Sequence, residues 1–257
     1  MSTPFLIPAT PTLPVPGSAI GWGRLIGASA ALAAAELATG IERPVLLLAE
    51  DPRHADQLEA EIRFFAGPDL PVEHFVEWET LPWDSFSPHQ DIISQRLNVL
   101  AALPNMRKGI IIAAASVLQQ RLPPVDYVAA RSLSLSEGQT LHRENFTNAL
   151  LAAGYYRVPQ VSEHGEFAVR GSLIDIFPMG AGTPVRIDFF DDEIESLRYF
   201  SPETQLSGST ISRIDVLPAR EVPLDADAIQ LFRDRYRERF EGQPGKSRVY
   251  RDVSDGI

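Results

Sequence analysis

Cysteine does not occur anywhere in this 257-residue chain, and lysine occurs only at Lys108 and Lys246. Without cysteine, disulfide bridges and thiolate chemistry are excluded, which fits a reducing compartment. All the other basic residues are arginine, a bias that we attribute to genome composition rather than to function. Nucleotide sites of the phosphate-loop kind require a lysine, so the scarcity of lysine leaves few positions where such a site could form.

Long hydrophobic runs are missing as well. The N-terminus carries prolines where a signal peptide needs a continuous apolar run, and it lacks the basic start of such a peptide. The longest apolar helix candidate, around Ala28 to Ala38, is short and contains Glu36, so we do not expect it to span a membrane. We therefore expect a soluble cytoplasmic protein that has no membrane partner.

Positive charge is outnumbered, with 34 acidic against 23 basic residues and a formal net charge of −11. Binding to a phosphate backbone rests on Lys and Arg, so this balance argues against the chain as a whole acting as a nucleic-acid clamp. Residues 131–217 follow the same trend, with seven Arg and no Lys against twelve Asp and Glu. A DNA-binding domain is thus an alternative that the charge disfavours, although a local basic patch stays open.

Residues 20–128 alternate between helical and apolar strand patterns, after a proline-rich lead-in over residues 1–19 that we expect to be extended. Such alternation is typical of an α/β domain built on a parallel sheet, whose strands are commonly buried on both faces. The expected helices are Ala28–Thr39 closed by Gly40, Pro52–Phe65, and a helix capped by Ser87 that runs to Leu103; the expected strands are Pro44–Ala49, Val72–Val76 and Gly109–Ala115.

The pattern changes after the paired prolines at 123 and 124. Residues 129–217 hold short alternating strands separated by Gly and Pro, with one helix over Thr140–Ala153 closed by Gly154, and predict a smaller α+β domain on an antiparallel meander. Leu224–Phe240 then predicts a helix with an aromatic stripe, before a loop-like end. Because such a stripe needs a surface to pack on, we interpret residues 218–257 as the truncated start of a returning part of the first domain.

A nucleotide site of the phosphate-loop kind is disfavoured. That site needs a Gly-rich loop, a Lys for the terminal phosphates and a Ser or Thr for the metal. The stretch GASAAL that begins at Gly27 contains no Lys. The GKS at Gly245 to Ser247 follows no apolar strand and has Phe240 where a phosphate loop needs Gly. We therefore expect no bound cofactor. The lack of a phosphate-loop Lys also disfavours the alternative function, an ATP-dependent helicase or translocase, more than any other alternative.

The sequence also favours neither a metal site nor a catalytic site. The five His residues are scattered, and the acidic run Asp191-Asp192-Glu193 is better interpreted as a solvated hairpin turn than as a cation site. Ser162, Glu163 and His164 are adjacent, which is not how a nucleophile and its base are arranged. Glu163, His164 and Glu166 form a minor acid-base hypothesis. The histidines are His54, His74, His89, His142 and His164.

One loop is rich in aromatics. The stretch ETLPWDSFSPHQ, Glu79 to Gln90, places Trp83 and Phe86 among Pro and Ser. In a nucleic-acid enzyme such a loop could stack on bases. Because few basic residues lie near it, we favour a loop whose aromatics pack on the edge of the sheet.

The most informative stretch is Glu166–Phe200, which predicts three short strands. The alternation of strand faces places Val185, Ile187 and Phe189 on one side of a strand, toward the core. It places Arg186, Asp188 and Phe190 together on the other side, and Arg170 lies on an earlier strand. Arginine beside an aromatic on a polar face is typical of protein interfaces. In the alternative interpretation Phe190 turns inward and Arg186 pairs with Asp188 or Glu195.

Three motifs carry a resemblance to a known family. They are RGSLIDIFPMG from Arg170, RIDFFDDEIESLRYF from Arg186, and ETLPWDSFSPHQDIISQRL from Glu79. Together they resemble the N-terminal UvrB-homology region of bacterial transcription-repair coupling factors (Mfd), over about residue 20 to the end of the chain. The first motif is also similar to one in the excision-repair subunit UvrB.

The resemblance implies a fold and a partner. It implies a degenerate RecA-like parallel-sheet domain without ATPase motifs, followed by an α+β domain that binds UvrA through Arg170, Arg186 and Phe190. It implies a non-catalytic recruitment module of transcription-coupled nucleotide excision repair. ATP and Mg, RNA polymerase and double-stranded DNA are implied only for other domains of the longer protein, as is a C-terminal domain that masks the UvrA face. None of those domains is expected in these 257 residues.

Overall fold

The computed structural model describes residues 13–81, 84 and 86–256. The chain divides into two compact units. The first runs to Asp84 and resumes over Ala102–Arg121, and the second comprises Ser85–Ala101 and the chain from Leu122 onward. The fold is mixed α/β, with one parallel sheet of three strands and two further sheets built mainly from antiparallel pairs. Among the described helices, none is both long enough and apolar enough to cross a membrane.

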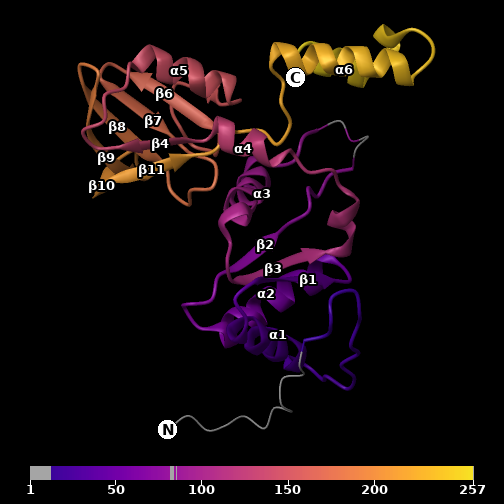
Figure 1. Ribbon diagram of the computed structural model, residues 1–257. Helices are drawn as coiled ribbons and strands as arrows, with labels where there is room; N and C mark the ends of the chain where they lie inside the picture. The colour runs from indigo at the N-terminus through magenta and orange to yellow at the C-terminus, as the bar shows by residue number, and fades with distance from the viewer. Residues whose placement is uncertain (1–12, 82–83, 85, 257) are drawn as a thin grey trace. The chain divides into compact units, whose positions relative to one another are not determined.

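The first unit is a parallel sheet with two helices on one face (Figure 1). The strands run in the order β1-β3-β2 and all pair in parallel. The Asp51 side chain caps the second helix by accepting a 2.8 Å hydrogen bond from the His54 amide, and Pro52 occupies its first turn. The elements are α1 (Ser29–Gly40), β1 (Pro44–Ala49), α2 (Pro52–Ala66), β2 (Val72–Phe75), β3 (Gly109–Ala114) and the 3₁₀ turns η1 (Leu103–Asn105) and η2 (Ala115–Gln119).

Two local expectations for the first unit are wrong. The strand β1 is not buried on both faces, because α1 and α2 cover only one side of the sheet and leave Leu46 and Leu48 53% and 48% exposed. Gly40 does not close α1 from outside: it is the last helical residue, and Ile41 follows in an extended conformation. Of the predicted lead-in, residues 1–12 lie outside the described residues.

Gly109 is the glycine on which the first unit depends most. Its φ is 132°, and a Cβ atom there would lie 2.6 Å from the Pro71 carbonyl oxygen. We expect Gly109→Ala to lower the free energy of unfolding by about 1–3 kcal/mol, because the residue adopts a conformation that side chains rarely allow. Chemical denaturation measures this. Gly40→Ala is the control: it has no atom within 4 Å of the added carbon, and we expect it to leave stability unchanged or raise it by up to about 1 kcal/mol. Equal effects of Gly109→Ala and Gly40→Ala on the free energy of unfolding would contradict the conclusion that position 109 requires glycine.

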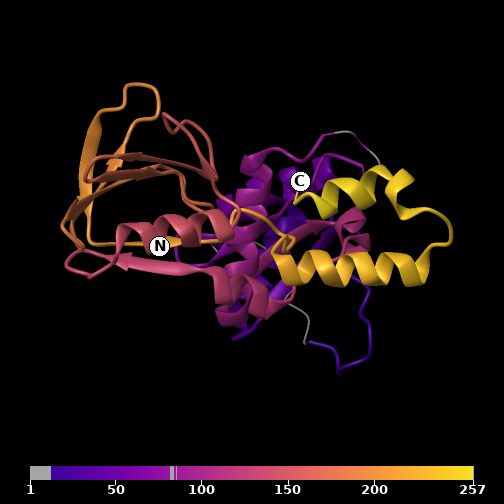
Figure 2. The same ribbon diagram turned by 90° about the horizontal axis from the view of Figure 1, so that it is seen from above.

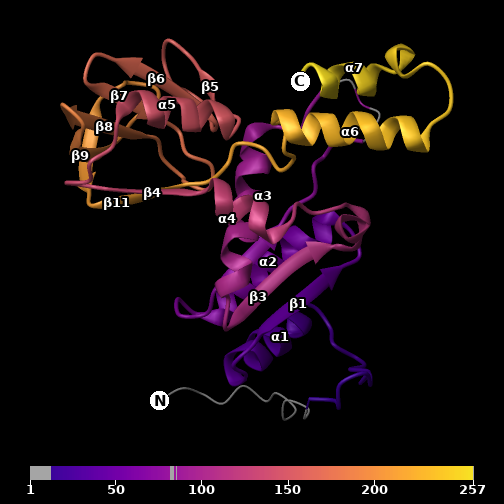
Figure 3. The same ribbon diagram turned by 45° about the horizontal axis from the view of Figure 1, so that its top comes forward.

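The second unit is built around a six-stranded sheet with the strand order β10-β9-β8-β7-β6-β5; Figure 1 labels β10 at one edge, and Figure 3 labels β5 at the other. Only β5 and β6 pair in parallel. A separate two-stranded sheet joins β11 to β4. The helices are α3 (Gln90–Ala102), α4 (Val125–Arg131), α5 (Arg143–Ala152), α6 (Ala226–Arg239), η3 (Pro244–Lys246) and α7 (Arg248–Ser254); the strands are β4 (Leu133–Ser136), β5 (Tyr156–Arg157), β6 (Glu166–Arg170), β7 (Leu173–Ile176), β8 (Val185–Phe190), β9 (Glu193–Phe200), β10 (Ser207–Ile211) and β11 (Arg213–Val216).

The main core of the second unit lies between one face of this sheet and its helices. Phe146 and Leu150 of α5 are buried there, together with Val185 and Ile187 of β8. The α5 helix ends as predicted: Gly154 has a φ of 94°, and the Tyr155 amide donates to the Leu150 carbonyl over 3.0 Å. The stretch Glu166–Phe200 forms four strands rather than three, because a tight turn at Gly171, with a φ of 62°, splits its first part into β6 and β7.

The helix α3 also belongs to the second unit, although the sequence pattern places it in the α/β layer. Its Leu97 is fully buried in the main core of that unit. The helix begins at Gln90, three residues after the predicted cap Ser87. Phe86, ahead of it, is 70% exposed and so does not pack on a sheet edge; Trp83 lies outside the described residues.

The C-terminal segment supplies its own packing surface. It is not a loop as predicted, because α7 forms and lies beside α6 (Figure 2). The ring of Tyr250 on α7 lies 6.1 Å from Phe232 and 5.1 Å from Tyr236, both on α6. The aromatic stripe of α6 is therefore covered in part by α7, and by contacts this segment groups with the second unit rather than the first.

Candidate partner-binding face

The strand register gathers the predicted site residues on one face of the six-stranded sheet. Residues directly opposite one another on paired strands share a face. Arg170 lies opposite Leu173, which in turn lies opposite Asp188. Asp188 shares its face of β8 with Arg186 and Phe190, since successive residues of a strand alternate. Arg170, Arg186 and Phe190 are thus on the face that points away from the main core, which we call the outer face.

Asp175 holds Arg186 in place. The carboxylate of Asp175 lies opposite Arg186 on β7 and is 1% exposed. It accepts 2.7 and 2.9 Å hydrogen bonds from Nε and Nη2 of Arg186, and this bidentate contact raises the pKa of the guanidinium. The guanidinium also lies 5.0 Å from the centre of the Phe200 ring. The alternative interpretation, in which Arg186 pairs with Asp188 or Glu195, is wrong in its partner, since the strand register brings Arg186 to Asp175.

Arg170 is the more accessible of the two arginines. Its side chain is 40% exposed, against 17% for Arg186. Its Nη1 lies 3.9 Å from Asp175, at the limit of an ion pair, and its Nη2 donates to the Pro159 carbonyl and to Oε1 of Gln205 over 3.2 and 3.3 Å. The contacts with Pro159 and Gln205 therefore hold the Arg170 guanidinium on one side, while its exposed side can still donate hydrogen bonds to solvent or to a partner.

Phe190 stands apart from the arginines at the end of β8. Its side chain is 70% exposed, so the alternative in which it turns inward is wrong. A two-residue turn follows, in which Asp191 has a φ of 54°. A cavity of about 270 Å³ opens beside Phe190, and three carboxylates line it together with Gly138 and Ile194. Those carboxylates belong to Glu137, Glu193 and Glu195.

A small second core stabilises the other end of the outer face. Phe177 and Phe200 are buried there beside Ala168, under Val161 from the loop that precedes β6. Asp175 itself is 1% exposed, so its ion pair with Arg186 is made in a partly desolvated setting. Sequence alternation alone does not show Asp175, because it lies in the apolar run LIDIF, where a strand buried on both faces is the ordinary interpretation.

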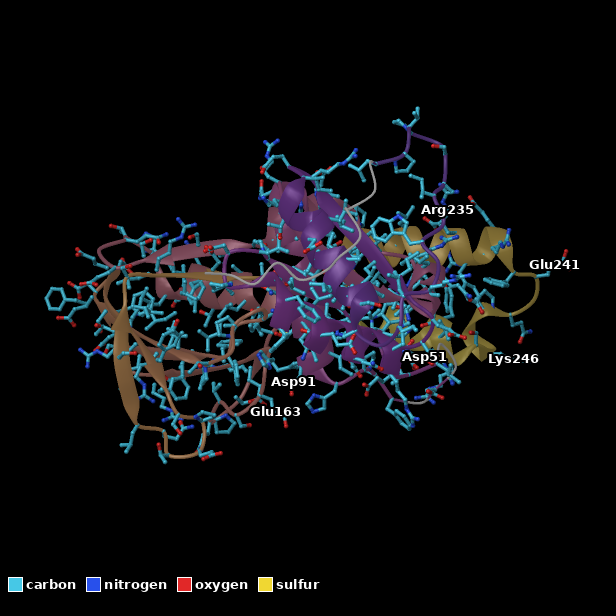
Figure 4. All side chains as sticks on the ribbon, turned by 90° about the horizontal axis from the view of Figure 1, so that it is seen from below. Asp51, Asp91, Glu163, Arg235, Glu241 and Lys246 are labelled. Carbon is cyan, nitrogen blue, oxygen red and sulfur yellow. The ribbon has the colours of Figure 1, made fainter. Side chains whose placement is uncertain are left out.

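The other candidate sites have structural roles. The Glu166 carboxylate accepts hydrogen bonds from the amides of Ser162 and Glu163 over 2.8 and 2.9 Å, and thereby shapes a turn. Nδ1 of His164 lies 2.6 Å from Asp91 of α3, and Nε2 lies 2.7 Å from the Ala181 carbonyl. Figure 4 labels Asp91 and Glu163 on the two segments that this histidine joins. The Glu166 carboxylate and the His164 ring of the acid-base hypothesis are thus both engaged in hydrogen bonds within the chain.

The metal and phosphate-loop interpretations gain no support either. In the part of the chain that the structure describes, His, Asp and Glu side chains nowhere form a group of three that could hold a metal ion. His74 instead lies 2.8 Å from Glu59 and lowers the pKa of that carboxyl. Lys246 lies in the 3₁₀ turn η3, which follows the helix α6 rather than a strand.

Comparison with known proteins assigns this arrangement to a class. Residues 133–222, which include every strand of the outer face, match the UvrB interaction domain family. The second unit therefore contains the stretch that matches this domain family.

Longer relatives match most of the chain. The chain is 45% identical to the transcription-repair-coupling factor of Escherichia coli (strain K12) over 91% of the chain's own length. It is 41% identical to the factor of Haemophilus influenzae over the whole of its own length, 100%. It is 31% identical to the Myxococcus xanthus protein of the same name over 86%. Together with the domain match, this similarity shows that the chain corresponds to an N-terminal region of transcription-repair-coupling factors. It spans about a fifth of the length of these relatives, covering 20–22% of them.

Proposed function

We propose that this chain is a non-catalytic recruitment module that binds UvrA and so brings excision repair to a stalled RNA polymerase. The match of residues 133–222 to the UvrB interaction domain carries the proposal. RNA polymerase and DNA would be bound by other parts of the longer protein. The first unit would be a degenerate RecA-like domain, since the loop that begins at Gly27 contains no Lys.

The outer face would be the UvrA-binding surface. Phe190 would insert as an apolar anchor, because an aromatic that is 70% exposed on a strand end gains most from burial at an interface. Arg170 would donate charge-assisted hydrogen bonds to acidic groups of UvrA. Arg186, whose guanidinium already holds Asp175, would add its remaining exposed edge and keep the strands in register. In the longer protein a C-terminal domain would compete for the same face.

The proposal predicts a large effect of Phe190 on binding. We expect Phe190→Ala to weaken the affinity for UvrA by about 2 kcal/mol, or roughly thirtyfold, as loss of an interface anchor commonly does. The thermal transition of the chain should not change, because the side chain is 70% exposed. Calorimetric titration of UvrA with each protein measures the affinity, and circular dichroism measures the transition.

The matched control is Phe64→Ala. Phe64 lies on α2 of the first unit and is 82% exposed, so the two changes remove the same side chain from two exposed sites. We expect the control to bind UvrA as the unchanged chain does. If Phe190→Ala binds as tightly as the control, the outer face is not the UvrA surface. If the unchanged chain does not bind UvrA at all, the proposed function itself fails.

A further inference from the structure

Gln205 has a backbone conformation that its residue type does not favour. It lies in the turn between β9 and β10, and its φ is 60°. The left-handed region costs a residue with a side chain about 1–2 kcal/mol. Surrounding contacts must therefore hold Gln205 there, and such strain is a reason to ask what those contacts achieve.

The contacts of Gln205 converge on the two arginines of the outer face. Its Oε1 accepts a 3.3 Å hydrogen bond from Nη2 of Arg170, and its backbone carbonyl accepts a 3.3 Å hydrogen bond from Nη1 of Arg186. Its Nε2 donates to the carbonyls of Val161 and Pro202 over 3.2 and 2.8 Å. The side-chain amide is thus fixed by two carbonyls, and its oxygen is left in a defined direction.

The competing partner for Arg170 is Asp175. That carboxylate is 3.9 Å from Nη1 of Arg170, but it is already engaged by Nε and Nη2 of Arg186. Gln205 and the Pro159 carbonyl therefore provide the shorter contacts of the Arg170 guanidinium. A free arginine carries about 2 kcal/mol of rotamer entropy, so an arginine held before binding loses less when it binds.

We infer that Gln205 is a positioning residue, which fixes the Arg170 guanidinium in the orientation that the UvrA-binding face presents. The inference rests on the proposed function because that function names UvrA as the partner. The contacts between Gln205 and Arg170 do not depend on it. It assigns to the β9–β10 turn a role in binding, although this turn need not contact UvrA itself. It also explains the left-handed glutamine, because a glycine would suit the backbone but could not hold Arg170.

The test separates stability from affinity. In Gln205→Gly the relief of backbone strain offsets the loss of the side-chain hydrogen bonds, so the stability of the chain should change little. Its affinity for UvrA should fall about threefold to tenfold, the effect of freeing one long side chain. If Gln205 had a purely structural role, the stability of the chain and its affinity for UvrA should fall together. Thermal denaturation and calorimetric titration with UvrA provide the two measurements.

A double-mutant cycle shows whether the effect passes through Arg170. Gln205→Gly should cause no further loss of affinity in an Arg170→Ala background. The same fold-loss in both backgrounds would overturn the inference and leave the proposed function intact. If no variant binds UvrA, nitrogen-15 relaxation of the Arg170 side chain still decides. It should become more mobile in Gln205→Gly, and unchanged mobility would overturn the inference.

Discussion

Replacing Asp175 with alanine is expected to lower the free energy of unfolding of the second unit by about 3 kcal/mol. The change removes a carboxylate that is 1% exposed and leaves the Arg186 guanidinium, 17% exposed, without its bidentate partner. Breaking a buried pair from one side costs more than the pair contributes, since the remaining charge stays desolvated. Chemical denaturation followed by circular dichroism measures the loss.

Asp188→Ala is the matched control for that experiment. Asp188 shares the outer face and lies two residues from Arg186, but it is partly exposed and accepts one 3.1 Å hydrogen bond, from Ser172. We expect a loss of at most about 1 kcal/mol. Equal losses of unfolding free energy in Asp175→Ala and Asp188→Ala would show that the buried ion pair of Asp175 contributes no more to stability than the exposed contact of Asp188. A second readout is UvrA binding, which should weaken in Asp175→Ala because Arg186 is no longer held.

Replacing Glu221 with alanine is expected to cost about 3–5 kcal/mol, the larger of the two effects. Glu221 follows β11 and lies against Arg96 of α3, with Nε–Oε1 and Nη2–Oε2 distances of 2.5 and 3.1 Å. The side chains are 4% and 0% exposed, so the arginine would lose this bidentate carboxylate partner in an almost fully desolvated setting. Amide hydrogen exchange should rise throughout α3 (Gln90–Ala102), since the pair fastens that helix to the unit.

The double change Arg96→Met with Glu221→Leu tests the physical reason. Apolar replacements of similar size commonly restore most of the stability that a single change removes, because no charge stays buried. We therefore expect the double variant to be more stable than Glu221→Ala. The exposed pair Arg213–Asp215, with both side chains 63% exposed, is the control. Its Arg213→Ala variant should behave as the unchanged chain. A double variant as unstable as the single one would show that α3 is held by other contacts.

The outer face could be predicted in part from sequence. Alternation along β8 was enough to place Arg186 and Phe190 on the side opposite Val185 and Ile187, whose side chains are fully buried. The partner of Arg186 could not be predicted, since it depends on the register between β7 and β8. Gln205 could not be found either, because nothing in the local sequence specifies a left-handed glutamine; its contacts come from segments up to 44 positions away.

The division of the chain was the harder problem. The helix α3 has the pattern of an α/β crossover, yet its Leu97 packs with residues far along the chain, and its Arg96 meets Glu221 at a separation of 125 positions. Local propensity does not contain such information. The helix α7 was missed for a similar reason: its seven residues become helical where Tyr250 packs against α6.

Because α3 lies in the second unit while the segments on both sides of it lie in the first, the backbone passes between the units three times, near residues 84, 101 and 121. A single nick by a protease at any one of these crossings would leave the two units joined by the other two. A protein that starts at Leu122 would contain the whole matched domain but lack α3, so the site where Leu97 packs would be open to water. The shortest independently folding form of the UvrB interaction domain should therefore include α3.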